Sequence, residues 1–227
     1  MGIFSKLFGK KYKTEFDSQP IEYAQTLSFN KEFFNIMKSD RFIARSDYKG
    51  LIQKYESTAT FFENNQRAKT LTYYCKQNKV NEKEINDFLV SYNSIKNLAN
   101  GSSIVDSHNE QYIQKHLLSE KNYLDGILKE IDPKILLDEE QRRVILSDED
   151  YSLVIAGAGA GKTTTVAAKV RYLVEKKHID PKQILVISCT NKAVGELKER
   201  INEGLLIPCP ITTFHSAGYA ILRKQDD

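Results

Sequence analysis

The chain has 227 residues, of which 41% are hydrophobic, and its formal net charge at pH 7 is +3. The hydrophobic content is sufficient for a folded core, and the length allows one large domain or two small ones. The charge is too small to indicate a nucleic-acid partner by itself, so any such partner must be argued from local residues. No apolar run is long enough to cross a membrane and no signal peptide is recognisable, so we expect no membrane partner.

The cysteines indicate a reducing environment. Cys75, Cys189 and Cys209 are odd in number and lack the spacing of a metal site. This usage is typical of reduced thiols, so we expect a cytoplasmic protein.

The chain begins with a basic segment. Four lysines and no acidic residue occur in residues 1–13, interleaved with Ile3, Phe4, Leu7 and Phe8. Such a segment could lie on a membrane or contact a phosphate backbone. Because chain ends are usually poorly ordered, we instead predict a flexible basic tail over residues 1–19.

The next region is helical in character. Between Pro20 and Pro133 glycines are few, and apolar residues recur at steps of three and four, which predicts an α-helical accessory domain over residues 20–135. A break at 100–103 precedes Ser107, a possible helix cap. The aromatic residues of these stripes are more typical of a core than of a base-stacking surface. The stripes are Leu51, Tyr55, Ala59 and Phe62; Ile85, Phe88, Leu89, Tyr92, Ile95 and Ala99; and Ile113, Leu117, Leu124, Ile127, Leu128 and Ile131.

The stretch from Ser152 to Thr165 has the pattern of a phosphate-binding loop. Leu153, Val154 and Ile155 predict a short buried parallel strand, and a glycine-rich turn and a helix follow. Glycines allow successive backbone N–H groups to point at phosphate oxygens, and the helix start adds its dipole. Lys162 can then reach the β- and γ-phosphates, while the Thr163 hydroxyl can bind Mg²⁺.

One position departs from the common pattern G-x-x-x-x-G-K-[ST]. Ala156 occupies the place of the first glycine, whereas Gly161, Lys162 and Thr163 fit. A chance glycine-rich turn is the alternative. The apolar run before the loop, and a helical pattern at Val166 and Val170 after it, favour the phosphate-binding interpretation.

The segment from Leu137 to Arg143 allows two interpretations. Its acidic residues resemble the magnesium-binding DExx element of an ATPase, but Pro133 leaves too short a strand before it. Alternatively, it is a glutamine loop ahead of the phosphate-binding loop, in which the Gln141 amide could both donate to and accept from adenine. We favour the glutamine loop.

Two further strands are predicted after the phosphate-binding loop. Asp180 and Pro181 make a turn, residues 184–187 make an apolar strand, and a second strand lies around Ile211. A helix with Val194, Leu197 and Ile201 on its buried face separates them, with Gly204 as its C-terminal cap, and another helix ends the chain. The loops at 188–193 and 212–216 each follow a strand's carboxyl end, which is where open α/β sheets bind ligands.

Four segments together resemble the amino-terminal part of superfamily 1 helicases of the UvrD/Rep kind, most of all the helicase IV type. They correspond to the family's Q motif and motifs I, Ia and Ib, and the resemblance covers about residues 136–223. It implies an incomplete RecA-like P-loop NTPase domain over residues 136–227, an α/β fold with a parallel sheet. In this family motif I commonly begins with alanine, as at Ala156. The segments are Leu137-Asp138-x-x-Gln141, Ala156 to Thr163, Thr190-Asn191-Lys192-Ala193 and Thr213-Phe214-His215.

The resemblance also implies roles for individual residues. Gln141 would read adenine, Lys162 and Thr163 would serve the γ-phosphate and Mg²⁺, and ATP with Mg²⁺ would be the cofactors. The partners would be single-stranded DNA and duplex junctions. The nucleotide site would comprise Gln141, Ala156, Gly157, Ala158, Gly159, Ala160, Gly161, Lys162, Thr163 and Thr164, and the DNA site Thr190, Asn191, Lys192, Thr213 and His215.

Two departures from the family pattern concern these sites. Many relatives have phenylalanine where Cys189 stands, and there it can stack on a base. Many have arginine where this chain has Thr164. The stacking contribution to DNA binding is therefore not expected here.

The expected activity belongs to a longer protein. In this family a DExx element and a second RecA-like domain complete the ATP site, and neither is recognisable after Ser216. We therefore expect the front end of an ATP-dependent DNA helicase that moves 3′ to 5′ along one strand and is not competent alone. The alternatives are another P-loop enzyme such as a nucleotide kinase, a non-catalytic nucleotide- or DNA-binding module, and a helical protein-interaction module.

Overall fold

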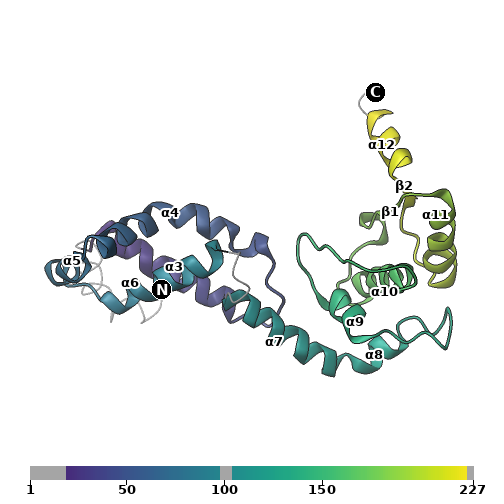
Figure 1. Cartoon of the computed structure of the whole chain (residues 1–227), viewed down its shortest axis with the longest axis horizontal. Helices are drawn as coiled ribbons and strands as arrows, with labels where there is room; N and C mark the ends of the chain where they lie inside the picture. Colours follow the sequence, from purple (N-terminus) through teal and green to yellow (C-terminus); the bar gives the residue numbers. More distant parts are fainter. Residues whose placement is uncertain (1–18, 98–103, 224–227) are drawn as a thin grey trace, which may run out of the picture. The chain divides into compact units, whose positions relative to one another are not determined.

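The computed structural model describes residues 19–97 and 104–223 (Figure 1). The predicted tail, apart from Gln19, lies outside these residues, as do Ala99 and the break at 100–103. The chain divides into two compact units, the first ending at Tyr112 and the second beginning at Ile113. Within the described residues the structure is mostly helical, with a small parallel sheet in the second unit.

Helices build the first unit, as its apolar stripes predicted. They are α3 (Ile21–Met37), α4 (Arg45–Arg67), α5 (Leu71–Asn78), α6 (Glu82–Lys96) and the first part of α7 (Ile104–Ser119). Helices α3, α4 and α6 all pack on one another. Hydrophobic residues at helical spacing therefore meet in one core.

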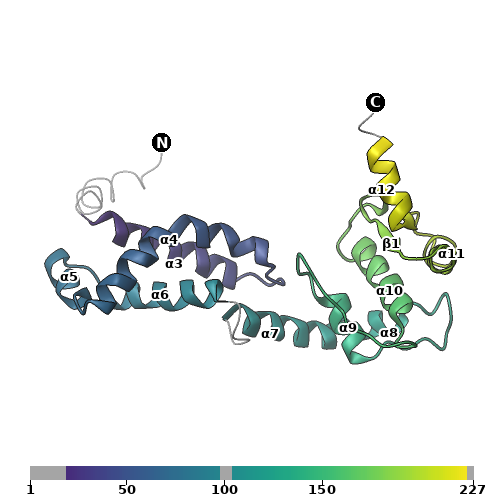
Figure 2. The ribbon, with the colours of Figure 1, turned by 45° about the horizontal axis from the view of Figure 1, so that its top comes forward.

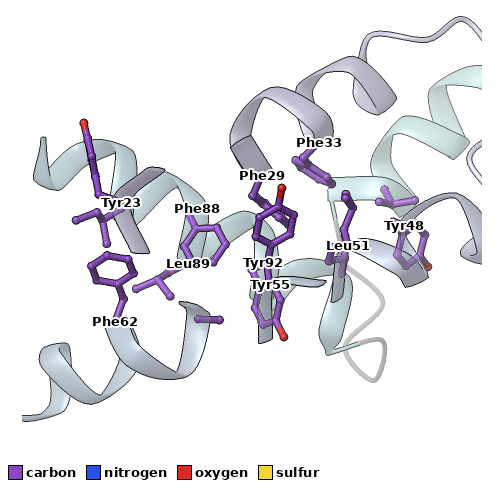
Figure 3. Packing of buried hydrophobic residues seen from close by; sticks show 14 of the residues in the cluster. Tyr23, Phe29, Phe33, Tyr48, Leu51, Tyr55, Phe62, Phe88, Leu89 and Tyr92 are labelled. Carbon is purple, nitrogen blue, oxygen red and sulfur yellow. The ribbon is translucent and has the colours of Figure 1, made fainter. Parts of the chain in front are cut away.

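Aromatic rings fill this core (Figure 3). Phe29 is fully buried, and its ring meets those of Phe88 and Tyr55 edge to face, with centroids 4.9 and 5.4 Å away. Edge-to-face pairs place the positive rim of one ring on the negative face of another. The described residues of the first two stripes are buried, which confirms that their aromatic side chains are core.

Buried polar contacts attach α7 to this unit. The Asn109 side chain accepts from the backbone N–H of Ile43 at 2.8 Å and donates to its carbonyl at 2.9 Å. Ser107 lies inside α7 and is not its cap, so that prediction is wrong: the helix already begins at Ile104. Nearby, the Arg41 guanidinium binds the Asp47 carboxylate through two contacts of 2.7 Å and lowers its pKa.

The second unit contains the predicted strands and the helices around them. Residues that precede the predicted boundary at 135 pack here, since Leu124, Ile127 and Leu128 share a buried cluster with Ala167. The boundary itself, drawn from a change in composition, stays a prediction. The elements are the end of α7, α8 (Lys121–Gly126), α9 (Glu139–Leu146), α10 (Lys162–Glu175), η2 (Pro181–Gln183), β1 (Val186–Ser188), α11 (Asn191–Lys198), the π-helical segment η3 (Glu199–Gly204), β2 (Ile211–Thr213) and α12 (Phe214–Arg223).

The sheet has two parallel strands. Val186 lies opposite Ile211, and Ser188 lies opposite Thr213. Val194, Leu197 and Ile201 are buried as predicted; α11 packs on both strands, and η3 packs on α10. Strand β1 starts two residues later than predicted, at Val186, whose backbone N–H donates to the carbonyl of Pro210 at 2.9 Å.

The local predictions for residues 153–155 and for Gly204 are wrong. Residues 153–155 form no strand, and Leu153 and Ile155 are 88% and 91% exposed. An apolar run of this kind becomes a buried strand only when neighbouring strands pair with it and both faces are covered, and no described strand does so. Gly204 is the last residue of η3, not its cap, and the left-handed residue after the segment is Leu206, with φ of 56°.

Candidate nucleotide and DNA site

The glycine-rich loop runs directly into α10 (Figure 2). Gly159 and Gly161 have φ of 77° and 73°, a left-handed region that costs other residues energy. Gly161 is the N-cap of α10, whose first residues are Lys162 and Thr163. The helix therefore presents its unpaired amides and positive dipole end to the loop, which is an arrangement suited to a phosphate group.

Lys162 extends back over the loop. Its ammonium donates to the carbonyls of Gly157 at 2.6 Å and Ala156 at 3.2 Å. A bound phosphate could replace these carbonyls as the partner of the ammonium. Thr163 lies half-buried in the first turn of α10, close to the same helix end.

Gln141 reaches this loop from α9. The residue lies in the first turn of a helix, so the predicted glutamine loop is wrong in its local structure: Asp138 caps α9, and the Asp138 and Gln141 side chains each accept from the other's backbone N–H. The Gln141 Nε2 donates to the carbonyl of Ala160 at 3.2 Å. A Cβ on Gly161 would lie 2.6 Å from that nitrogen, so the absence of a side chain there permits the contact.

A cavity of about 880 Å³ lies beside these groups. It is bounded by α9, α10, residues 153–157 and β1, and both Gln141 and Lys162 line it. The volume falls in the range of small-molecule sites, about 300 to 1,000 Å³. The wall is largely apolar, and its polar side chains include Gln141, Lys162 and Lys169.

Lys169 is a partly buried cation in the wall of this cavity. Its ammonium donates to the carbonyls of Ile145 at 2.8 Å and Ser147 at 2.5 Å, beside the C-terminus of α9. Burial lowers its pKa to about 8, with Lys177 adding to the lowering and Asp148 opposing it. At neutral pH the group is therefore still mainly protonated.

The two predicted DNA loops lie next to each other. They follow Ser188 and Thr213, which are register partners at the carboxyl ends of β1 and β2. Thr190 caps α11 by accepting from the backbone N–H of Ala193 at 3.2 Å, so Asn191 and Lys192 lie exposed in the first turn.

The second predicted loop, at 212–216, is wrong in its local structure: residues 212–213 belong to β2, and Phe214 to Ser216 form the exposed first turn of α12. The Thr213 hydroxyl accepts from the backbone N–H of Ser216 at 3.2 Å, which shapes the start of α12. His215 is exposed, with its ring edge-on to that of Phe214 at a centroid distance of 6.4 Å. All five predicted DNA-site residues thus lie at or just beyond the carboxyl ends of two paired strands.

The described residues offer neither a cluster of metal ligands nor a membrane-spanning helix. Residues 19–97 and 104–223 contain no group of three or more His, Cys, Asp or Glu side chains that could hold a metal ion. An ATP-associated Mg²⁺ would instead bind the Thr163 hydroxyl together with phosphate oxygens, which fits the position of that residue. None of the described helices could span a membrane.

Known proteins match the second unit. The family model for the UvrD/REP helicase N-terminal domain matches residues 137–227. The resemblance to UvrD/Rep helicases is confirmed for this part of the chain. Similar proteins include a probable DNA helicase II homolog of Mycoplasma capricolum, 42% identical over 92 residues, and the ATP-dependent DNA helicase PcrA of Bacillus subtilis, 40% identical over 95 residues. The ATP-dependent DNA helicase srs2 of Schizosaccharomyces pombe is 40% identical over 93 residues.

These matches cover a small part of each UvrD/Rep-type protein. The aligned segment is 39% of this chain and 13% of the Mycoplasma protein, 40% and 13% for PcrA, and 39% and 10% for srs2. The activities in the relatives' names therefore belong to proteins much longer than the segment that aligns with this chain.

Three residues near the UvrD/Rep-like site were missed from the sequence. Arg142 pairs with Asp125 at 2.6 Å and joins α9 to α8, while Arg200 donates to the Thr164 hydroxyl at 3.3 Å. No local pattern indicates either contact. Lys169 did have a signal, because it interrupts the apolar face of α10, three residues after Val166 and next to Val170.

Proposed function

We propose that residues 136–227 are the nucleotide- and DNA-binding front end of an ATP-dependent DNA helicase. The parent activity would couple ATP hydrolysis to 3′ to 5′ movement along single-stranded DNA and to duplex separation. The observation that carries this proposal is the placement of a phosphate-binding loop, a glutamine and two paired strand ends in one unit that matches the helicase family.

In this proposal the unit is a P-loop NTPase domain of the RecA-like kind. Residues 157–163 hold the phosphates through backbone N–H groups, and the Lys162 ammonium exchanges its loop carbonyls for the γ-phosphate. Thr163 supplies a hydroxyl ligand to Mg²⁺. The bound ion neutralises charge on the phosphates.

Gln141 can bind adenine without giving up its present contacts. Its Nε2 has a second N–H beyond the one donated to Ala160, and its Oε1 has a second lone pair beyond the one used by Asp138. A donor and an acceptor on one planar amide complement the adjacent N7 and amino group of adenine. Guanine presents a carbonyl in place of that amino group, so the site should favour ATP over GTP.

DNA would bind across the two neighbouring loops. The Lys192 ammonium supplies a phosphate contact, and Thr190, Asn191, Thr213 and His215 supply hydrogen-bonding groups near it. We further propose that these 227 residues bind nucleotide without substantial turnover. The DExx element and second domain that the resemblance implies for hydrolysis are not recognisable in the sequence.

The test is a pair of titrations with nucleotide and with single-stranded DNA. We expect Lys162→Ala to weaken ATP binding by at least about tenfold and Lys192→Ala to weaken DNA binding selectively. The exposed Lys182, on η2, gives the matched control Lys182→Ala, which should leave both affinities unchanged. If the wild-type chain binds neither ligand, the proposed nucleotide and DNA binding is contradicted. If the pure chain hydrolyses ATP rapidly when DNA is added, the proposed lack of turnover is contradicted.

A further inference from the structure

Helix α10 contacts α9 through a partly buried ammonium as well as presenting the phosphate-binding residues. Lys162 begins α10, and Lys169 follows two turns later on the same helix. The Lys169 ammonium donates to the carbonyls of Ile145 and Ser147, and a third carbonyl, that of Val144, lies 3.5 Å away.

These carbonyls belong to the C-terminal end of α9. The last carbonyls of a helix have no partner within it and carry the negative end of the helix dipole. A partly buried cation supplied by a neighbouring helix satisfies them from outside. Removing it would take this donor from the carbonyls of Ile145 and Ser147 at a partly buried site, where an unpaired acceptor is costly.

The other end of α9 carries Gln141. Helix α9 has eight residues, so about 12 Å of hydrogen-bonded helix connects its two ends. One end is held by Lys169 on α10 and the other contacts the phosphate-binding loop through Gln141 and Ala160. A rotation of α9 about either contact would displace the other.

We propose that Lys169 is a positioning residue for base recognition: by binding the C-terminal carbonyls of α9, it holds the Gln141 amide at the adenine side of the nucleotide site. This rests on the proposed function, because it assumes that Gln141 reads adenine. Lys169 itself does not touch the nucleotide. In this proposal the phosphate contacts come from Lys162 and Thr163 in the first turn of α10, whereas α9 reaches the loop through the hydrogen bond from Gln141 to Ala160.

This role predicts a selective defect. Lys169→Met keeps the length and apolar stem of the side chain but removes the charge and the donors. We expect the affinity for ATP to fall about tenfold while the affinities for GTP and inorganic tripolyphosphate change by less than about twofold. A purely structural role would weaken all of these ligands together. The measurement is isothermal titration of the full chain with each ligand in turn.

Three variants sharpen the test. Lys169→Arg retains a charge and several donors, so it should preserve most of the ATP to GTP preference. In a double variant, Gln141→Ala and Lys169→Met should not be additive, because both remove the same base contact. Lys182→Met removes an exposed lysine outside α9 and α10 and should leave the preference unchanged.

The outcomes separate this inference from the proposed function. If Gln141→Ala lowers the ATP to GTP preference and Lys169→Met does not, the positioning role is overturned and the proposed function stands. If Gln141→Ala itself has no effect on the preference, adenine reading by Gln141 fails. Should Lys169→Met unfold the unit, Lys169→Gln is measured instead, because its amide is uncharged and one atom shorter than the lysine chain and so cannot bind the carbonyls of Ile145 and Ser147 as the ammonium does. An unchanged preference in Lys169→Gln would then overturn the role, and a reduced one would support it.

Discussion

The two units reach a buried core in different ways. In the helical unit, large aromatic side chains such as Phe29 and Tyr55 meet within a core supplied by helices of that same unit. The second unit buries mainly aliphatic side chains, and its segment 153–155 remains exposed. A helix makes its backbone hydrogen bonds locally, whereas a strand needs neighbours that come from elsewhere in the chain. The helical unit should therefore be the more autonomous of the two.

The largest expected effect is on the core of the helical unit. Phe29→Ala removes a fully buried ring whose centroid lies 4.9 to 6.1 Å from those of four other aromatic residues, and should reduce the free energy of unfolding by about 3 to 5 kcal/mol. Urea unfolding followed by circular dichroism measures it. The control Phe34→Ala, on the same helix but 62% exposed, should change it by less than about 0.5 kcal/mol.

The same variant tests whether the units are independent. Phe29→Ala should leave ATP binding by the second unit unchanged at temperatures where the helical unit is unfolded. Equal loss of nucleotide affinity and helical structure would show that the two units fold as one.

A smaller effect is expected at the phosphate-binding loop. Gly161→Ala places a Cβ at a left-handed φ and 2.6 Å from the Gln141 Nε2, so it should destabilise the second unit by about 1 to 3 kcal/mol. It should also weaken ATP binding. Gly195→Ala, inside α11 with open space around it, should instead stabilise the unit by up to about 1 kcal/mol. Melting temperatures of the two variants should shift in opposite directions, and a shift of both in one direction would argue against this backbone geometry.

The smallest effect compares two isoleucines of the second unit. Ile145→Val removes a methylene group from a fully buried side chain and should cost about 1 kcal/mol. The same change at Ile155, which is 91% exposed, should change the free energy of unfolding by less than about 0.5 kcal/mol. Equal costs in urea unfolding would mean that residues 153–155 are buried in solution.

Local signals predicted most of the helical elements. Apolar stripes such as Leu51, Tyr55 and Phe62 predict both a helix and the face of it that is buried, because their spacing follows the helical period. The start of α9 also had a local signal, since Asp138 with Gln141 three residues later is a capping-box pattern. The interpretation as a loop overlooked that pattern.

Contacts between distant segments could not be predicted in the same way. An apolar run such as residues 153–155 predicts a strand but does not say whether a neighbouring strand is available to pair with it. The partners of Lys169 and Arg200 lie more than twenty residues away in the sequence, and no spacing rule connects them. The candidate site was found through the phosphate-loop pattern and the family resemblance, whereas its supporting contacts required the structure.

The segment formed by α11 and η3 spans the distance between the two candidate ligand sites. It begins at Asn191, beside the candidate DNA loop, and its Arg200 donates to Thr164, two residues beyond Lys162 on α10. The segment therefore connects the two candidate sites, through Asn191 at one end and through Arg200 near the other. A shift of α11 along its axis would either lengthen the hydrogen bond between Arg200 and Thr164 or move the first turn of α10 with it. A change at the candidate DNA site is therefore expected to displace residues of the candidate nucleotide site.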